Sequence, residues 1–305
     1  MQEARATAGI HHVTAITGAP QPLHAFMTRT LGQRMVKRTV NFDDPGTWHL
    51  YYGDALGRPG TIMTHFPYPG AAAGRQGSGQ ASAVAYAVPR GVLGDWRRRL
   101  ETAGHPVRTS ERFGDPILSF EDPHGQPMEF VAVDGTGNAP GGFHSVTLWV
   151  NDPEPTARVL TEIFGYEAAG TETGTDGTRL RLSVPGDAHG VILDILHRDD
   201  APRARPGVGT IHHVAFRASD DDMQQTIREA LQSAGHRVTP QIDRQYFRSI
   251  YFREPGGVLF EVATDPPGFT VDEPETSLGG SLKLPPQHEH LRERLVATLP
   301  PLEPA

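Results

Sequence analysis

The sequence predicts an α+β protein of four βαβββ modules, arranged as two tandem repeats and forming mixed sheets that curve into cups. Three observations predict this fold class. The chain matches itself at an offset of about 132 residues. Each copy shows the pattern of one strand, one helix and three strands twice. The chain is also rich in turn residues, with 34 Gly and 27 Pro among 305 residues, as expected for many short elements joined by turns.

The repeat rests on three pairs of similar segments, at offsets of 133, 131 and 132 residues. They are residues 27–32 with 160–165, 100–105 with 231–236, and 120–130 with 252–262. We therefore expect two copies of one unit, at 9–133 and 142–264. The predicted organisation is an N-terminal domain of two modules at 1–135, a C-terminal domain of two modules at 141–268, and a Pro-rich tail with a short helix at 269–305.

In the first module, residues 10–17 alternate as in a strand and residues 20–31 have helical spacing. Three more strands are expected at 33–40, 48–53 and 61–66, separated by Asp-Pro-Gly and Arg-Pro-Gly turns. The same order recurs with first strands at 81–88, 143–150 and 211–217, and with helices near 92–103, 153–164 and 220–234. One module is too small to bury both faces of its sheet, so we expect the modules to pair.

The remaining segments are interpreted as connections. Residues 70–79, 134–142 and 197–209 are Gly-rich or contain Pro, and we expect them to link modules. The tail has one amphipathic stretch, residues 288–299, in which His288 and His290 are expected to face solvent.

The composition excludes several classes of function. The net charge is −8, from 28 Lys and Arg against 36 Asp and Glu, which argues against nucleic-acid binding because phosphate contacts need a basic surface. The absence of cysteine excludes disulfides and thiolate metal sites. No apolar run approaches the roughly 20 residues of a membrane helix, and the N-terminus shows no apolar signal segment. We therefore expect a cytoplasmic protein with no nucleic-acid or membrane partner, and leave open whether it is a homo-oligomer.

The main candidates for a metal-binding site are two histidine pairs, each at the start of the first strand of its module. His11 and His12 lie in module 1, and His212 and His213 lie in module 4. Because alternate strand residues point to opposite faces, only one member of each pair is expected to face the cup at a given depth. Glu261 lies in the last strand of module 4, which can line the same cup. Two imidazoles and one carboxylate form the facial triad of Fe(II) oxygenases, which leaves coordination sites open for substrate and O2.

The repeat offset selects the second histidine. An offset of 133 takes His11 to His144 and His12 to Ser145, so module 3 has its histidine one residue out of register. Module 2 offers no histidine in its first strand, so His12 is the remaining partner for His213 and Glu261. This choice requires modules 1 and 4 to share a cup. Fe(II) is favoured by the ligand set, although Mn(II), Zn(II) or Ni(II) also suit it.

Other readings of these residues stay open. A His-His pair on a strand can be a satisfied core feature, and Glu261 can be a rim carboxylate. Glu129 and Asp194 occupy the position of Glu261 in modules 2 and 3 and are candidates for a second metal site, but no histidine accompanies them. Residues 43–46 are interpreted as a turn. The strand at 48–53 either closes an aromatic pocket or packs in the core, through Trp48, His49, Tyr51 and Tyr52.

At these residues the sequence resembles the vicinal oxygen chelate superfamily, which includes glyoxalase I, fosfomycin-resistance proteins and extradiol dioxygenases. It is most similar to ring-cleaving dioxygenases that act on hydroquinones. The resemblance covers nearly the whole chain, and its motifs are GIHHVTAITG (9–18), VNFDDPGTWHLYYGD (40–54), RPGTIMTHFPYPG (58–70), GTIHHVAF (209–216), FREPGGVLFEVATDPPGF (252–269) and LPPQHEHLRERLVATLPPL (284–302).

The resemblance implies an Fe(II)-dependent, extradiol-type oxidoreductase that opens a hydroquinone- or catechol-type ring with O2. It places the metal ligands on His12, His213 and Glu261. Polar residues around the metal then fall on His11, Thr14, His212, Arg244 and Tyr251. Ordinary extradiol dioxygenases take both histidine ligands from modules 3 and 4. Ser145 departs from that pattern, and the resemblance implies instead the arrangement of hydroquinone enzymes, with ligands from modules 1 and 4.

Roles for the surrounding residues follow from their chemistry. His11 and His212 are candidates for moving protons, because histidine titrates near neutral pH. Tyr251 can donate to a substrate oxygen, and Arg244 can hold a second ring oxygen or a substituent by paired hydrogen bonds. The alternatives are that the histidines only orient the ligands and that Arg244 and Tyr251 are ordinary rim residues.

Two rival functions use the same fold. A glyoxalase-like isomerase or thiol transferase usually completes its metal shell with a fourth protein group, and the facing strand offers only Thr64. A non-catalytic small-molecule-binding protein typically lacks the triad. Both rivals are therefore less favoured than ring cleavage.

Overall fold

The computed structural model describes residues 7–186, 189–199 and 201–303. Its elements follow the predicted order. Module 1 contains β1 (Ile10–Thr17), α1 (Pro20–Ala25), β2 (Arg34–Val40), β3 (Trp48–Gly53) and β4 (Ile62–Pro67). Module 2 contains β5 (Gln80–Pro89), α2 (Leu93–Thr102), β6 (Arg108–Arg112), β7 (Asp115–Glu121) and β8 (Pro127–Val133). Module 3 contains β9 (Phe143–Val150), α3 (Pro153–Arg158), β10 (Glu167–Gly174), β11 (Gly177–Ser183) and β12 (Ile192–His197). Module 4 contains β13 (Thr210–Ala218), α4 (Asp221–Ser233), β14 (Ile242–Asp243), β15 (Phe247–Arg253) and β16 (Leu259–Pro267).

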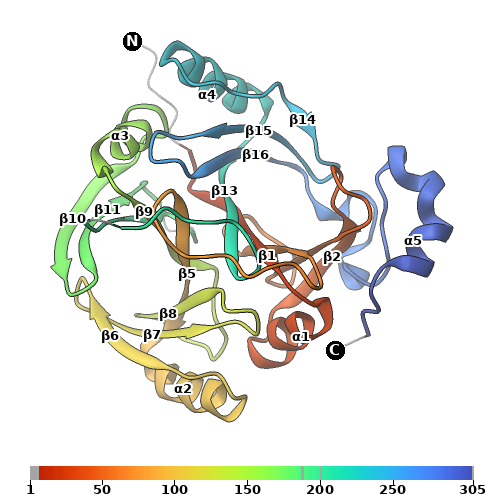
Figure 1. The fold of residues 1–305 in the computed structure, drawn as a ribbon, viewed down its shortest axis with the longest axis horizontal. Coiled ribbons are helices and arrows are strands. Elements are labelled where there is room, and N and C mark those ends of the chain that lie inside the picture. Colours follow the sequence, from red (N-terminus) through yellow and green to blue (C-terminus); the bar gives the residue numbers. More distant parts are fainter. Residues whose placement is uncertain (1–6, 187–188, 200, 304–305) are drawn as a thin grey trace.

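The strands form two mixed sheets of eight strands each, and this confirms the predicted fold class. Modules 4 and 1 make one sheet, in the order β14-β15-β16-β13-β1-β4-β3-β2, and modules 3 and 2 make the other. Within each sheet two modules meet through antiparallel first strands, β1 with β13 and β5 with β9. Figure 1 shows both sheets curving, with helices α1 to α4 on their outer sides. Modules 1 and 4 therefore share a cup, as the choice of His12 required.

A β-bulge at each histidine pair interrupts strand alternation, and the expectation that only one member faces the cup holds for His11 and His12 but not for His212 and His213, which both face it. In the β1–β13 ladder, Ile10 pairs with Phe216 and His12 with Ala215, which leaves His11 as an extra residue. On the partner strand, Thr14 pairs with His213 and Ala15 with Ile211, which leaves His212 as the extra residue. A bulge re-aims a side chain out of simple alternation. Both members of each pair can therefore lie near the cup.

Two predicted helices change type before they end. The stretch expected at 20–31 is α-helical over Pro20–Ala25 and π-helical over Phe26–Thr30, and the stretch at 153–164 repeats this with a π-helix at Val159–Ile163. A glycine with positive φ follows each end, Gly32 at 74° and Gly165 at 72°, where a side chain would be strained. Apolar periodicity does not distinguish α-helical from π-helical turns, so the π-helical segments could not be predicted from the sequence.

The connectors are not independent linkers. Residues 73–78 and 203–208 run side by side and form bridges between Ala73 and Val208, Arg75 and Arg205, and Ser78 and Arg203. They join the two halves of the chain across the junction of the sheets.

The tail wraps around the outer edge of module 1 and ends in α5 (Arg292–Thr298), which Figure 1 shows in blue beside β2. Buried Lys37 on β2 holds the tail through Asp272 and Glu273, with 2.5 Å from its Nζ to each carboxylate. The expectation that His288 faces solvent is wrong, because it is only partly exposed and its Nε2 bonds the Phe42 carbonyl at 2.9 Å. His290 is exposed as expected.

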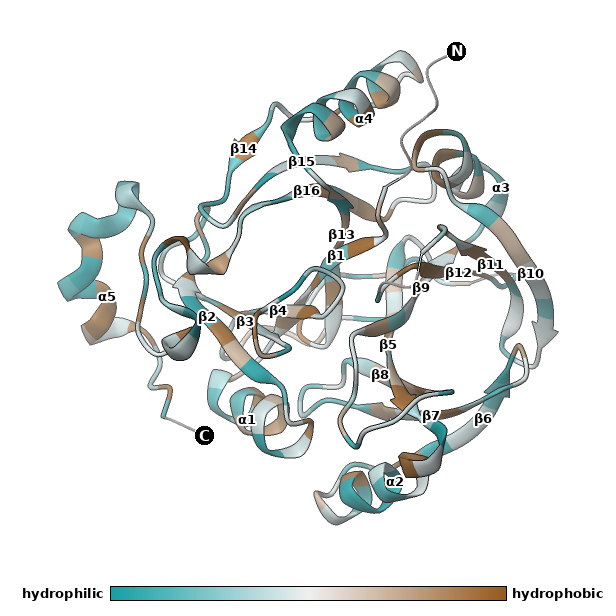
Figure 2. Cartoon of the chain, turned by 180° about the vertical axis from the view of Figure 1, so that it is seen from behind, coloured by the Kyte–Doolittle hydropathy of each residue, from teal (hydrophilic) through white to brown (hydrophobic). Residues whose placement is uncertain are grey.

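Apolar side chains fill the space between the sheets and the helices. Figure 2 shows the hydrophilic residues gathered on the outward turns of the helices, α4 and α5 among them. Among the described residues, no helix combines the length and the apolar character that crossing a membrane demands.

Candidate functional site

His12, His213 and Glu261 converge in the cup that modules 1 and 4 share. Their candidate ligand atoms all lie within 4.8 Å of one another, and all three residues are buried. His213 Nε2 is 2.9 Å from Glu261 Oε2, His12 Nε2 is 3.5 Å from the same oxygen, and the two Nε2 atoms are 3.4 Å apart. The three residues come from β1, β13 and β16, which are neighbouring strands of one sheet. No other group of this kind is found among the described residues.

Each ligand histidine is held by its bulged neighbour. His11 Nδ1 lies 2.9 Å from His12 Nδ1, and His212 Nδ1 lies 2.7 Å from His213 Nδ1. One nitrogen of each contact must carry the proton. If His12 and His213 carry it on Nδ1, their Nε2 lone pairs face Glu261. The contact fixes the ring orientation and, with the proton on His12 and His213, also the tautomer, as partners of metal-bound histidines commonly do.

Glu261 is fully buried, and its two oxygens have different surroundings. Ser249 Oγ donates to Oε1 at 2.5 Å. Oε2 lies opposite the imidazoles and has no hydrogen-bond partner among the described residues. Burial raises the pKa of Glu261, but its interactions with His12 and His213 outweigh burial and hold the pKa well below its ordinary value. An ionised buried carboxylate with an unpartnered oxygen, beside two imidazole nitrogens, fits a divalent cation.

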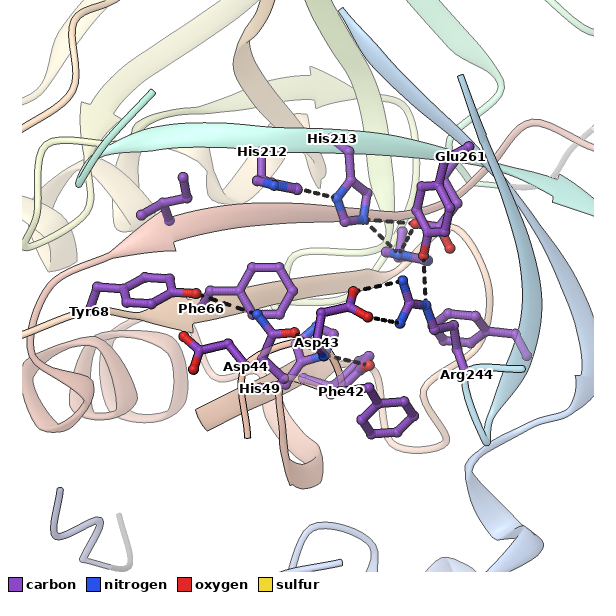
Figure 3. Close-up of a pocket in the computed structure, with 16 residues that line it drawn as sticks. Phe42, Asp43, Asp44, His49, Phe66, Tyr68, His212, His213, Arg244 and Glu261 are labelled. Carbon is purple, nitrogen blue, oxygen red and sulfur yellow. Dashed lines mark hydrogen bonds and ion pairs between the residues drawn. The ribbon is translucent and has the colours of Figure 1, made fainter. Parts of the chain in front are cut away.

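The group opens into a cavity of about 390 Å³. Its wall is mostly aromatic, with Phe42, Tyr51, Phe66, Tyr68, Phe247 and Tyr251 around the three candidate ligands. Figure 3 shows His213 and Glu261 on one side of this space and the loop that carries Asp43 on the other. The cavity is large enough for one small aromatic ring, and a ring can pack against these walls.

The module 1 wall contains a buried hydrogen-bond chain that crosses three strands. Thr14 Oγ1 lies 2.7 Å from Thr64 Oγ1, which lies 2.8 Å from His49 Nε2. His49 Nδ1 in turn lies 2.9 Å from the Tyr51 hydroxyl. Burial, with a further contribution from the Glu261 charge, raises the pKa of Tyr51 well above its ordinary value, so its phenol stays protonated. Thr14 thus acts on the cavity indirectly, through Thr64 and His49.

The module 4 wall presents Tyr251 and Arg244. Arg244 Nε donates to the Tyr251 hydroxyl at 3.2 Å. The two terminal nitrogens of the same guanidinium bond the Asp43 carboxylate at 3.2 and 2.9 Å (Figure 3). Burial and the charge of Glu261 raise the pKa of Tyr251, so this hydroxyl also keeps its proton. Arg244 directly follows β14, in the short connection to β15.

The second cup has a different polar centre. Glu129 accepts two hydrogen bonds from Arg112, at 2.8 and 2.9 Å, and Asp194 accepts two from Arg181, at the same distances. These carboxylates occupy the position of Glu261, and guanidinium groups satisfy them. The bulge persists with His144, whose Nδ1 contacts Ser145 Oγ at 3.0 Å. The hypothesis of a second metal site at Glu129 and Asp194 therefore receives no support.

The structure brings together most residues that the sequence singled out. His12, His212, His213, Arg244, Tyr251 and Glu261 line the cavity, whereas His11 and Thr14 are buried behind it. His49 and Tyr51 line the cavity too, while Trp48 and Tyr52 on the same strand point into the core.

Sequence reasoning missed Asp43, Phe247 and Ser249. Phe247 and Ser249 could have been found, because they alternate with Tyr251 on the strand next to Glu261. Asp43 gave no such signal, because its role depends on a partner 201 residues away.

Comparisons with known proteins agree with this site. Residues 142–262 match the family described as the Glyoxalase/Bleomycin resistance protein/Dioxygenase superfamily. MhqO of Bacillus subtilis (strain 168), which is named as a ring-cleaving dioxygenase, is 44% identical over 312 residues that cover 98% of this chain and 98% of MhqO. The chlorohydroquinone/hydroquinone 1,2-dioxygenase of Sphingobium indicum is 35% identical and covers 98% of each chain.

A solved structure extends the similarity to three dimensions. The crystal structure of a Bacillus subtilis subsp. subtilis str. 168 protein, named as a dioxygenase, is 43% identical with a TM-score of 0.93, and the match covers 98% of this chain and 99% of that one. With relatives this similar along nearly their whole length, the chain belongs to the Glyoxalase/Bleomycin resistance protein/Dioxygenase superfamily and, within it, to the group of ring-cleaving dioxygenases.

Proposed function

We propose that this protein is an Fe(II)-dependent dioxygenase that cleaves a hydroquinone- or catechol-type ring beside one of its hydroxyl groups. The observation that carries the proposal is the group of His12, His213 and Glu261, which opens directly into an aromatic cavity. Three protein ligands leave room for a substrate oxygen and O2. The name of the Sphingobium indicum relative, a hydroquinone 1,2-dioxygenase, supports hydroquinones as the first class to test.

Bound Fe(II) would favour the ionised form of a phenol and supply electrons for the activation of O2. The protein supplies orientation. Phe66, Phe247 and the tyrosine rings of the cavity wall offer apolar faces against which the substrate ring can pack. Glu261 contributes one negative charge, which keeps the net charge of the bound cation low.

The hydroxyl of Tyr251 is set up to donate to a substrate oxygen. Its oxygen accepts from Arg244 Nε, so its own proton remains available on the cavity side. Arg244 positions Tyr251 in this scheme. Tyr51 offers a second hydroxyl from the opposite wall, fixed by the chain through His49 and the two threonines.

The two bulged histidines take different roles. Burial, and then the charge of His213, lowers the pKa of His212 to about 3, although the residue as a whole is exposed. With the shared proton on His213, neutral His212 accepts through Nδ1 and carries its own proton on Nε2, from which it can donate to an oxygen of the substrate or of O2. His11 does not line the cavity and packs against Phe247, with 5.1 Å between ring centroids, so we assign it an orienting role.

The test begins with anaerobic Fe(II) loading, followed by O2 uptake with a panel of hydroquinones and catechols. Wild type and His213→Ala are compared, and bound metal is measured in both. We expect one metal per chain and O2 consumption with at least one hydroquinone in the wild type, and loss of both in the variant. Stoichiometric metal without O2 uptake for any phenol would contradict the proposal and favour an isomerase or transferase.

A further inference from the structure

Acidic side chains outnumber basic ones among the described residues that line the cavity. Arg244 is the one permanent cation among the described residues that line it. The carboxylates of Asp43, Asp44 and Glu261 line the same space. A substrate that enters therefore meets an acidic lining, unless Arg244 is free to receive it.

Arg244 is not free. Its two terminal nitrogens make a two-pronged ion pair with Asp43, and its Nε holds Tyr251. Such paired bonds match the geometry of a carboxylate, so Asp43 occupies the place in which a substrate carboxylate would bind. The Asp43 side chain is 74% exposed and that of Arg244 is 17% exposed. The acid therefore covers the arginine from the solvent side.

The loop that carries Asp43 is fixed from both sides. The Asp43 backbone N–H donates to Asn41 Oδ1 at 3.0 Å, and the preceding carbonyl, of Phe42, accepts from His288 of the tail at 2.9 Å. Neighbouring Asp44 has a different partner, since its Oδ2 accepts from the Thr47 hydroxyl at 3.0 Å. Two adjacent carboxylates thus line one cavity, and only the first neutralises Arg244.

We propose that Asp43 determines the charge of the substrate: by occupying Arg244, it makes the site select uncharged phenols and reject rings that bear a carboxylate. This inference rests on the proposed ring-cleaving function and narrows its substrate class. Rejection has two components, which are repulsion by the acidic lining and the absence of a free guanidinium. Specificity of this kind arises from an unfavourable contact with the wrong ligand.

The experiment compares two ligands that differ in charge and by one methyl group, 2,5-dihydroxyphenylacetate and its methyl ester. Dissociation constants are measured anaerobically by calorimetry on the metal-loaded full chain. We expect the wild type to bind the ester at least about tenfold more tightly than the acid. In Asp43→Asn, and in Asp43→Ser as a second variant, this ratio should shrink by about tenfold because Arg244 becomes available to the acid.

Asp44→Asn is the matched control, because it removes the same charge from the same loop without releasing Arg244. It should change the ratio much less than Asp43→Asn, and Asp43→Asn combined with Arg244→Gln should restore preference for the ester. Equal binding of acid and ester by the wild type would overturn the inference, as would equal effects of the two Asn variants. A lack of O2 uptake with either ligand would count against the proposed chemistry alone, because the binding ratios are judged separately.

Discussion

Glu261 illustrates how a single residue depends on partners from other strands. It has no exposed surface, yet two imidazoles keep it ionised and a serine hydroxyl holds one of its oxygens. Because Ser249 bonds Oε1, the carboxylate is oriented with Oε2 toward His12 and His213. A hydroxyl of this kind orients a metal ligand without touching the metal, and its loss typically lowers metal affinity by about 10- to 100-fold.

We therefore expect Ser249→Ala to weaken Fe(II) binding by roughly tenfold or more, measured by anaerobic titration with a competing chelator. The second cup provides the matched control. Ser119 Oγ lies 3.4 Å from Glu129 Oε1, a contact between a serine and a carboxylate outside the candidate metal site, so Ser119→Ala should leave Fe(II) affinity unaltered. Equal weakening by both variants would show that the effect is not specific to the site.

At the scale of elements, the chain of Thr14, Thr64 and His49 ties β1, β4 and β3 together behind the cavity. Thr64→Val preserves shape but leaves the Thr14 hydroxyl and a His49 nitrogen without their partner. The Thr14 hydroxyl is fully buried whereas His49 lines the cavity, so we expect the free energy of unfolding to fall by about 1–3 kcal/mol, the cost of one unsatisfied buried group. We also expect kcat for the best phenol to fall, because Tyr51 loses its fixed orientation, while metal content stays at one per chain.

Thr39→Val is the matched control for this chain. Thr39 is fully buried on β2, and its hydroxyl has no hydrogen-bond partner among the described residues. Its replacement by Val should be neutral or stabilising in urea unfolding, and kcat should be retained. If Thr39→Val destabilised as much as Thr64→Val, the hydrogen-bond chain would not explain the loss.

The elements themselves were largely predictable, because strand and helix periodicities are local. The bounds of β1, β3 and β9 agree with the predicted strands at 10–17, 48–53 and 143–150. The convergence of His12 with His213 could be inferred because the chain repeats itself. The bulges at His11 and His212 could not, because a bulge exists only relative to the register of a partner strand. The contact of Asp43 with Arg244 could not be predicted either, because it joins modules that are distant in sequence.

At the scale of the whole molecule, duplication has produced two cups with different polar centres. One holds the candidate metal ligands, and in the other Arg112 and Arg181 neutralise the equivalent carboxylates. The arginines of the second cup therefore stabilise the fold where a cation is lacking. This view predicts that the two cups respond differently to the loss of a polar residue.

Arg112→Met should leave Glu129 buried without a cationic partner. Breaking a buried ion pair from one side costs about 3–5 kcal/mol, and we expect the free energy of unfolding to fall by about 3 kcal/mol because the pair keeps some exposure. Fe(II) stoichiometry should remain one per chain. Urea unfolding and metal analysis of the same sample check both parts, and a loss of metal would show that the cups are not independent.

Buried neutral histidines make the stability of the whole chain depend on pH. His65 on β4 is buried and its Nδ1 has no hydrogen-bond partner among the described residues. Burial, and then the charge of His124, lowers the pKa of His65 from 6.5 to about 3. His65 is therefore protonated near pH 6.5 in the unfolded chain but only near pH 3 in the folded chain. Stability is complete above the unfolded pKa and is lost as the pH falls through this window.

Between about pH 7 and pH 5.5, this single group should remove about 1 kcal/mol from the free energy of unfolding. His65→Leu abolishes the titration, so its urea midpoint should decline less than that of the wild type over the same interval. The comparison within one interval cancels the contributions of all other groups, which titrate alike in both proteins. Parallel declines would mean that His65 is protonated in the folded state as readily as in the unfolded chain, and that its burial has no influence on its pKa.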